Sequence, residues 1–133
     1  MKDEQSLRSA LCTHVKRKYH AQPERLWARY PDYFIFRRAD NRKWFALVMN
    51  IPRSKLGLDG EEEVNVLNVK LPDARLVDLL TAQPGYFPGY HISRGSWVSI
   101  LLDGTVPMEE IKHWLAESYA VTGPKTKRGG KQP

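Results

Sequence analysis

The residues best suited to catalysis gather in one short stretch, Gly85–Gly104, which contains His91, Ser93, Ser96 and several aromatic side chains. A histidine close to a serine can act as the base that activates a nucleophile. Hydrolases that use this pair hold the serine in a glycine-flanked turn between a strand and a helix, and that motif is absent from this stretch. We therefore expect His91 to sit at the end of a strand, bonded to backbone, and not to act as a catalytic base.

The other titratable residues form no better catalytic or metal-binding pattern. The histidines are scattered along the chain, without the spacing of metal ligands: His14, His20, His91 and His113. The single cysteine, Cys12, lies two residues before His14 on a predicted helix, so the two side chains point about 200° apart. The acidic stretch 59–63 lacks the twelve-residue pattern of a calcium loop. The sequence therefore predicts no enzyme, no metal ion and no cofactor.

Basic side chains beside two predicted turns suggest a different chemistry. Four of them, Arg37, Arg38, Arg42 and Lys43, lie at one turn, and Arg94 lies at a second. Lysine and arginine at the tips of hairpins can contact the phosphates of nucleic acid. The tryptophans could supply rings for base stacking, although such rings more often fill or cover a core. These five basic residues are our candidate DNA-binding site, and basic tips that only keep a sheet edge soluble are the alternative.

The positive charge is distributed unevenly along the chain. Residues 1–45 carry 11 Lys or Arg and 5 Asp or Glu, residues 46–123 carry 6 and 10, and residues 124–133 carry 4 and none. The net charge of the whole chain is +6, and without the last ten residues it is about +2. Charge alone therefore does not indicate nucleic-acid binding. The positive N-terminal third and the positive tail would indicate it if folding placed them on one face.

A second functional hypothesis uses the aromatic residues of the same stretch. Tyr86, Tyr90, His91 and Trp97 could line a concave surface beside the sheet that binds a small ligand or a protein. Exposure decides this hypothesis, because aromatic side chains that are all buried form no such surface. The sequence does not indicate which partner would bind or whether the chain forms oligomers.

The elements that must position these residues begin with a helix and a hairpin. The helix is predicted from near Asp3, with Leu7, Leu11 and Val15 on one apolar stripe. Aromatic and branched residues predict strands over 33–37 and 43–51, joined by the turn residues between them. A third strand is predicted over 63–70, where Val64, Val66 and Asn68 face one way and Asn65, Leu67 and Val69 face the other.

The second half of the chain predicts two more helices and two more strands. A helix runs from Asp73 to about Ala82, with Leu76, Leu79 and Leu80 directed inward. Residues 85–89 are expected to be a loop, followed by strands over 90–92 and 97–102. The last helix begins near Pro107 and buries Met108, Ile111, Leu115 and Tyr119. The predicted class is α+β, an antiparallel sheet of about five strands with helices packed on one face, because strands joined by short turns cannot be parallel.

The length and composition fit one small domain with a short tail. The chain has 133 residues, of which 41% are hydrophobic, enough for one core. We expect a single domain over 1–123 and a disordered basic tail over 124–133, which has no apolar side chain to bury. No apolar run approaches the roughly 20 residues that span a membrane, and the N-terminus has no signal-peptide core. A cytoplasmic protein is therefore expected.

A series of short segments, taken in order and spacing, resembles the MmcQ/YjbR family of small bacterial proteins. The segments that carry this resemblance are Trp27, Tyr30-Pro31, Phe34–Arg37, Lys43–Leu47, Val64–Lys70, Pro88–His91, Trp97, Leu102–Gly104 and Glu117–Tyr119. Together they extend over about residues 5–123, nearly all of the predicted domain.

The resemblance implies a CyaY-like fold, with helices on one side of an antiparallel sheet. It also implies a DNA-binding role through two wing-like hairpins, with no enzymatic activity. The second hairpin departs from the family pattern, which has Asn-Lys at the start of its turn and a histidine before the tryptophan. In this chain the turn begins Ser93-Arg94, so the positive charge is kept, and Ser96 replaces the histidine.

Overall fold

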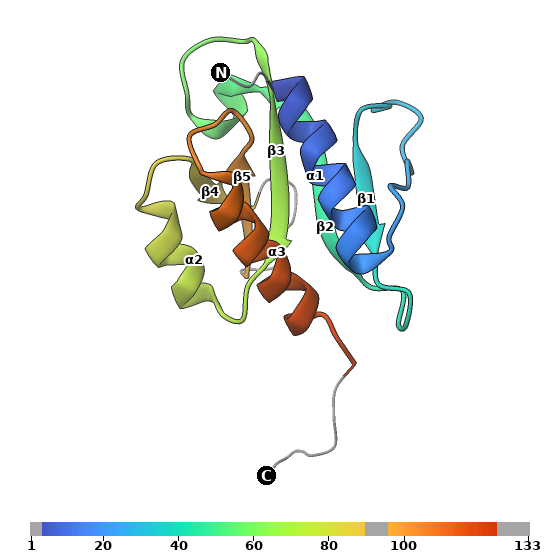
Figure 1. Ribbon diagram of the computed structural model, residues 1–133. Helices are drawn as coiled ribbons and strands as arrows, with labels where there is room; N and C mark the ends of the chain where they lie inside the picture. The colour runs from blue at the N-terminus through green and yellow to red at the C-terminus, as the bar shows by residue number, and fades with distance from the viewer. Residues whose placement is uncertain (1–3, 90–95, 125–133) are drawn as a thin grey trace.

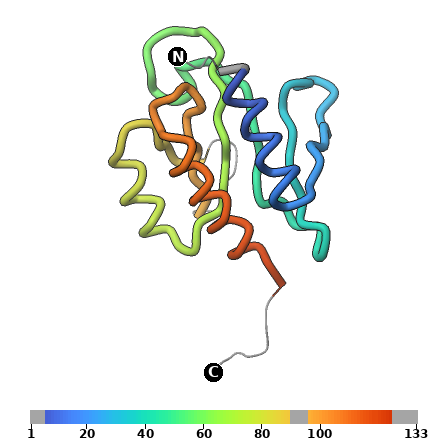
Figure 2. Tube along the Cα trace, viewed as in Figure 1, coloured from blue at the N-terminus to red at the C-terminus, as the bar shows by residue number. Residues whose placement is uncertain are grey.

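An antiparallel five-stranded sheet with the order β1-β2-β3-β5-β4 forms the frame of the molecule. The computed structural model describes residues 4–89 and 96–124. The elements are α1 (Glu4–Tyr19), β1 (Phe34–Arg37), β2 (Trp44–Pro52), the 3-10 helix η1 (Arg53–Leu56), β3 (Glu63–Lys70), α2 (Ala74–Thr81), β4 (Tyr86–Pro88), β5 (Trp97–Leu101) and α3 (Met108–Val121). The three helices cover one face of the sheet (Figures 1 and 2). The α+β class predicted from the sequence is confirmed.

Both faces of the sheet are apolar, and β3 contributes buried side chains to each of them. Its residues 64–69 are all buried. Leu67 and Val69 join the core beneath the helices, whereas Val64 and Val66 join a second cluster on the opposite face. The alternation predicted from the sequence is thus confirmed. Partly buried side chains pack against the second cluster, and most come from loops or strand ends: Trp27, Tyr33, Trp44, Leu56, Leu58 and Phe87.

The apolar stripes of α1 and α3 agree with the sequence, and that of α2 does not. Leu7, Leu11 and Val15 of α1 are buried, as predicted. In α2 the buried residues are Val77 and Leu80, whereas Leu79 is 68% exposed. The Asp73 carboxylate accepts a hydrogen bond from the backbone N–H of Leu76 and sets where the helix starts. With that start, Val77 and Leu80 lie three apart on one face, and Leu79 points away from the sheet.

The strand β4 replaces a predicted loop. Residues 85–89 were expected to be irregular, yet Tyr86–Pro88 pairs with Val98–Ile100 of β5. Gly85 has φ +89, and a Cβ added there would lie 2.6 Å from a methyl carbon of Val106. Only glycine fits this bend without strain. Pro88 is compatible with β4 because β4 is an edge strand, where a missing N–H is tolerated. The strand predicted over 90–92 lies outside the described residues.

Acidification should weaken the packing around the last turns of α1. His14 lies edge-on to Tyr19, with ring centres 6.1 Å apart, and its buried Nε2 has no hydrogen-bond partner among the described residues. Burial lowers the pKa of His14 below its ordinary 6.5, and the charges of Lys112 and Lys18 lower it further. As the pH falls, the unfolded chain therefore takes up a proton on His14 at a higher pH than the folded chain does. The folded state loses stability as the pH falls below 6.5, the ordinary pKa of histidine.

The measurement is the free energy of unfolding in urea at neutral pH and at about pH 5.5, where histidine becomes charged. The wild type should lose more stability on acidification than the variant His14→Gln. The variant His113→Gln removes an exposed histidine and should behave like the wild type. Identical pH dependence in all three proteins would contradict the assignment to His14.

Candidate nucleic-acid interface

The described strand ends beside the two predicted basic turns lie at the same end of the sheet. The β1–β2 pairing ends at Arg37 opposite Trp44, just before the turn. On the other side, Trp97 begins β5 and pairs with Lys70, the last residue of β3. Because β2 and β3 pair antiparallel, with Leu47 opposite Asn68, the start of β2 lies next to the end of β3. The β1–β2 turn and the start of β5 therefore lie at one end of the sheet.

The last turns of α1 and α3 reach this same end (Figure 1). The side-chain amide of Asn41, in the β1–β2 turn, donates a 2.8 Å hydrogen bond to the carbonyl oxygen of Thr122 just after α3. The rings of Tyr19 at the end of α1 and Tyr119 in α3 lie 4.5 Å apart. The β1–β2 turn and two helix ends are thus packed together, although they come from distant parts of the chain.

Five exposed cations gather at this end, and we call them the basic end: Lys16, Arg17, Lys18, Arg42 and Lys43. The first three occupy the last turn of α1, where positive charge favours the helix dipole. The described chain also leaves the domain here, at Gly123 and Pro124, and the sequence beyond it carries four more Lys or Arg. Five of the 11 Lys or Arg of residues 1–45 therefore lie at the end of the molecule where the described chain leaves the domain.

Acidic side chains gather at the opposite end of the sheet. Asp59, Glu61, Glu62 and Glu63 are all exposed, and they lie in the segment between η1 and the start of β3. The strand β3 itself runs from Glu63 at this end to Lys70 near the basic end. The cations of the basic end and this acidic stretch therefore lie at opposite poles of the domain, although Arg53 and Lys55 of η1 lie beside the acidic residues.

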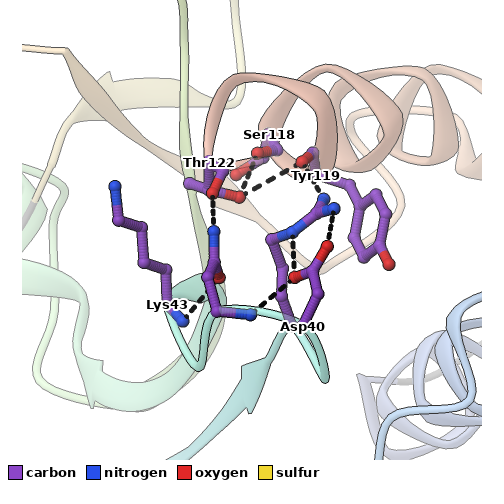
Figure 3. Close-up of polar contacts among 7 residues, drawn as sticks. Asp40, Lys43, Ser118, Tyr119 and Thr122 are labelled. Atoms are coloured by element: carbon purple, nitrogen blue, oxygen red, sulfur yellow. Dashed lines mark hydrogen bonds and ion pairs between the residues drawn. The ribbon is translucent and has the colours of Figure 1, made fainter. Parts of the chain in front are cut away.

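Arg38 does not belong to the basic end, although the sequence predicts that it contacts phosphate. Its residue is only 8% exposed, and its Nε and Nη2 donate hydrogen bonds of 2.9 and 2.7 Å to the Asp40 carboxylate (Figure 3). Its Nη1 donates to the carbonyl oxygen of Tyr119, and its guanidinium carbon lies 3.8 Å from the centre of the Tyr119 ring. The prediction for Arg38 is corrected: the side chain fastens the β1–β2 turn to α3.

The remaining hairpin cations differ in their availability. Arg37 is half-buried, and its Nε donates a 2.9 Å hydrogen bond to Glu24, which neutralises part of its charge. Arg42 lies 3.9 Å from the same carboxylate but is 66% exposed. Lys43 is exposed, and no ion pair within 4.0 Å is found for it among the described side chains. Arg94, the fifth predicted residue, lies outside the described residues.

Sequence reasoning left three residues out of the site, Lys16, Arg17 and Lys18. Their place after the apolar stripe of the first predicted helix indicates only solvated residues at a helix end. The available signal was the excess positive charge of residues 1–45, to which they contribute three of 11 Lys or Arg. Their position beside Arg42 and Lys43 depends on the contacts of the β1–β2 turn with α3, which the sequence pattern does not reveal.

The structure does not bring the described members of the aromatic hypothesis together. Tyr86 is 3% exposed, and its hydroxyl contacts the Glu110 carboxylate and accepts a 3.1 Å hydrogen bond from Trp114. Burial, then the hydrogen bond to Glu110, raises the pKa of Tyr86. Trp97 is half-buried, and by strand alternation it faces the side opposite to Val98 and therefore opposite to Tyr86. Tyr90 and His91 lie outside the described residues.

A cavity of about 550 Å³ nevertheless borders Tyr86 and Phe87. Apolar Leu58 and Leu101 and the charged residues Arg53 and Asp103 also line it. It lies near the acidic end, away from the basic end. Among the described residues, no group of three or more His, Cys, Asp or Glu is placed to hold a metal ion. Within the described part of the chain, no helix has the length and apolar character needed to cross a membrane.

Comparison with known proteins places the chain among relatives of the same size. The family model described as YjbR matches residues 16–121. The protein named as uncharacterized protein YyaQ from Bacillus subtilis is 39% identical over 115 residues, which cover 86% of this chain and 97% of YyaQ.

Solved structures show the same arrangement of elements. A crystal structure of a Pseudomonas syringae protein superposes with a TM-score of 0.84 at 35% identity, covering 87% of this chain and 98% of that one. A solution NMR structure from the same organism gives 0.79 at 33% identity, covering 93% and 98%. A Deinococcus radiodurans protein, at 23% identity and a TM-score of 0.56 over 100% and 97% of the two chains, shares the fold. On its sequence match and its structural likeness, the chain belongs to the YjbR family.

Proposed function

We propose that this protein binds DNA through its basic end, by contacts to backbone phosphates. The observation that carries the proposal is the meeting of Lys16, Arg17 and Lys18 with Arg42 and Lys43 at one pole of a domain that has little net charge without its tail. No carboxylate lies within 4.0 Å of four of these five cations among the described side chains, and Arg42 has only its 3.9 Å contact with Glu24.

The arrangement suits a phosphate backbone better than it suits recognition of bases. Consecutive residues at a helix end point about 100° apart, so Lys16, Arg17 and Lys18 spread their charges over a wide arc. Contacts of this kind release counterions and position the protein without reading sequence. The described basic end contains no exposed aromatic ring between its cations on which a base could stack. We therefore expect a preference for duplex over single-stranded DNA.

The test is a titration of a labelled DNA duplex with the full chain, followed by fluorescence anisotropy at several salt concentrations. If all five cations contact phosphates, log K should fall with log salt with a slope of about −4 to −5. At physiological salt the Kd should lie in the range of about 10⁻⁶ to 10⁻⁴ M that is typical of non-specific binding. Absence of binding at about 50 mM salt would sink the proposal.

A matched variant separates the domain from its tail. Replacing Lys125, Lys127, Arg128 and Lys131 with glutamine removes the positive charge of the tail and keeps the chain length. The proposal expects this variant to retain binding with the slope of about −4 to −5 that five phosphate contacts give, because the basic end remains. Complete loss of binding in this variant would show that the tail alone attracts DNA, and the proposal would be wrong.

The cavity beside Phe87 supports a second candidate function, binding of a small ligand. Its volume of about 550 Å³ and its mixed lining are those of an ordinary ligand pocket. A fragment screen by NMR should find compounds that perturb Leu58, Phe87 and Leu101, and Phe87→Ser should abolish their binding. The cavity is remote from the basic end, so this variant should leave DNA affinity unchanged. A screen without hits at these residues would exclude the second candidate.

A further inference from the structure

A separate cavity of about 320 Å³ lies between α1 and the start of β1. Its lining consists of Arg8, Ser9, Cys12 and Thr13 from α1, Arg25 from the segment before β1, and Phe34 from β1. Arg8 and Cys12, like Ser9 and Thr13, are four residues apart and so lie one turn above each other on the helix. The lining therefore contains two guanidinium groups, two hydroxyls and one thiol, with a single apolar ring as its floor.

Arg8 is a buried cation, and the described residues bond only some of its guanidinium N–H groups. The residue is 9% exposed, and its Nη1 donates a 2.6 Å hydrogen bond to the side-chain oxygen of Asn65 in β3. Its Nη2 donates a 2.9 Å bond to the backbone carbonyl of Asp32. A guanidinium has five N–H groups, and among the described residues these bonds occupy two of them. Both partners are neutral acceptors, and no described carboxylate lies within 4.0 Å of Arg8.

Arg25 brings a second positive charge to the same place. Its guanidinium carbon lies 5.0 Å from the centre of the Phe34 ring, and that of Arg8 lies 5.1 Å from the same centre. Burial lowers the pKa of Arg8, Asp32 acts in the opposite direction, and Arg25 adds to the lowering. No described carboxylate lies within 4.0 Å of Arg25 either. Two cations that repel each other across a cavity are stabilised when an anion occupies the space between them.

We propose that this cavity binds a compact phosphate, either inorganic phosphate or a small phosphate monoester, between Arg8 and Arg25. Arginine favours such oxyanions because its planar fork donates two parallel hydrogen bonds. The hydroxyls of Ser9 and Thr13 add neutral donors at the rim, where both residues are exposed. Both guanidinium groups pack on the Phe34 ring, so the site offers no free ring for a nucleobase, and its volume is at the low end for ligand pockets.

The single cysteine of the chain provides a local probe for this site. Cys12 is half-buried and lines the cavity, so a bound phosphate shields its thiol. Alkylation of the full chain by iodoacetamide, which is uncharged, is followed at about pH 8.5, where a thiol begins to ionise. Phosphate and glycerol phosphate should slow the reaction in a saturable way. Sodium chloride at matched ionic strength and acetate should not, because neither offers a tetrahedral dianion.

Two variants that each remove one positive charge distinguish binding at this site from a general effect of the protein's charge. Arg25→Gln should raise the half-saturating phosphate concentration at least about tenfold, because a charge-assisted contact is lost. Arg29→Gln removes an equal charge from the same segment, but Arg29 does not line the cavity. This variant should change the half-saturating phosphate concentration less than about twofold. Arg8→Lys keeps the charge and loses the fork, so binding should weaken even where the fold is intact by circular dichroism.

Several results would overturn the proposal. Alkylation that phosphate does not slow, or that chloride or acetate slows equally, would show that no phosphate site exists. Equal losses in Arg25→Gln and Arg29→Gln would show a general charge effect. Protection by an oligonucleotide but not by phosphate or glycerol phosphate would assign the residues to a nucleic-acid surface instead. The DNA titrations above do not depend on this cavity, so the two proposals fail separately.

Discussion

Replacing Arg42 and Lys43 together with glutamate should lower the affinity for duplex DNA by roughly 10- to 100-fold near 0.1 M salt. Each phosphate contact contributes close to one unit to the slope of log K against log salt, so two lost contacts remove about two units. The slope of the double variant should therefore fall from about −4.5 to about −2.5. Both side chains are exposed at the β1–β2 turn, so the fold should tolerate the change.

The matched control reverses two charges near the other pole. Lys55 lies in η1, and the exposed Arg29 lines a small pocket together with Glu63, so both lie near the acidic end and the pair changes the net charge by the same amount. The control variant Lys55→Glu with Arg29→Glu should bind DNA within about threefold of the wild type, because both charges lie near the acidic end and salt screens them from a phosphate at the basic end. Equal losses in both double variants would mean that DNA responds to net charge alone, and the basic end would lose its assignment.

Replacing Ser118 with alanine should destabilise the fold by about 2–4 kcal/mol, because two buried backbone groups lose their hydrogen-bond partner. Ser118 is fully buried in α3. Its hydroxyl donates a 2.7 Å hydrogen bond to the carbonyl oxygen of Phe45 and accepts a 2.9 Å bond from the backbone N–H of Lys70. The β2–β3 pairing stops at Leu47 and Asn68, so the serine hydroxyl bridges the strands where their own ladder ends.

Urea unfolding measures this loss, which is a large fraction of the roughly 5–15 kcal/mol that stabilises a domain of this kind. Ser118→Cys has nearly the same shape but donates weakly, so it should lose an intermediate amount. Ser54→Ala removes an exposed hydroxyl and should change stability by less than about 0.5 kcal/mol. If Ser118→Ala is as mild as Ser54→Ala, the serine bridge contributes little to the fold.

The contacts of α3 with the β1–β2 turn connect the two predictions. Ser118 holds α3 to the sheet, and Arg38 and Asn41 hold the turn to the carbonyl oxygens of Tyr119 and Thr122. These bonds hold the turn that carries Arg42 and Lys43 against the end of α3, and Tyr119 of α3 in turn packs on Tyr19 at the end of α1. A variant such as Arg38→Gln should therefore weaken DNA binding only through the position of the turn, because its own guanidinium does not reach the surface.

The sequence by itself determined the class, the strand alternation and most of the boundaries of this protein. Period-two patterning of residues 63–70 and the apolar stripe of Leu7, Leu11 and Val15 are local signals, which neighbouring residues along the chain carry completely. The segments that carry the family resemblance were also recognisable, because their order and spacing are properties of the linear sequence. Errors appeared where local preference was weak, as in α2, where Leu79 is exposed, and in the three-residue strand β4.

Only the tertiary structure decided which charges act together. Arg38 and Arg42 look equivalent in the sequence, yet Arg38 is buried against Tyr119 and Arg42 is exposed. Arg8 and Arg25 are separated along the chain and meet on the ring of Phe34. The physical reason is that burial and charge proximity depend on contacts between distant segments, such as that of the β1–β2 turn with α3. Residue type and spacing along the chain do not contain those contacts.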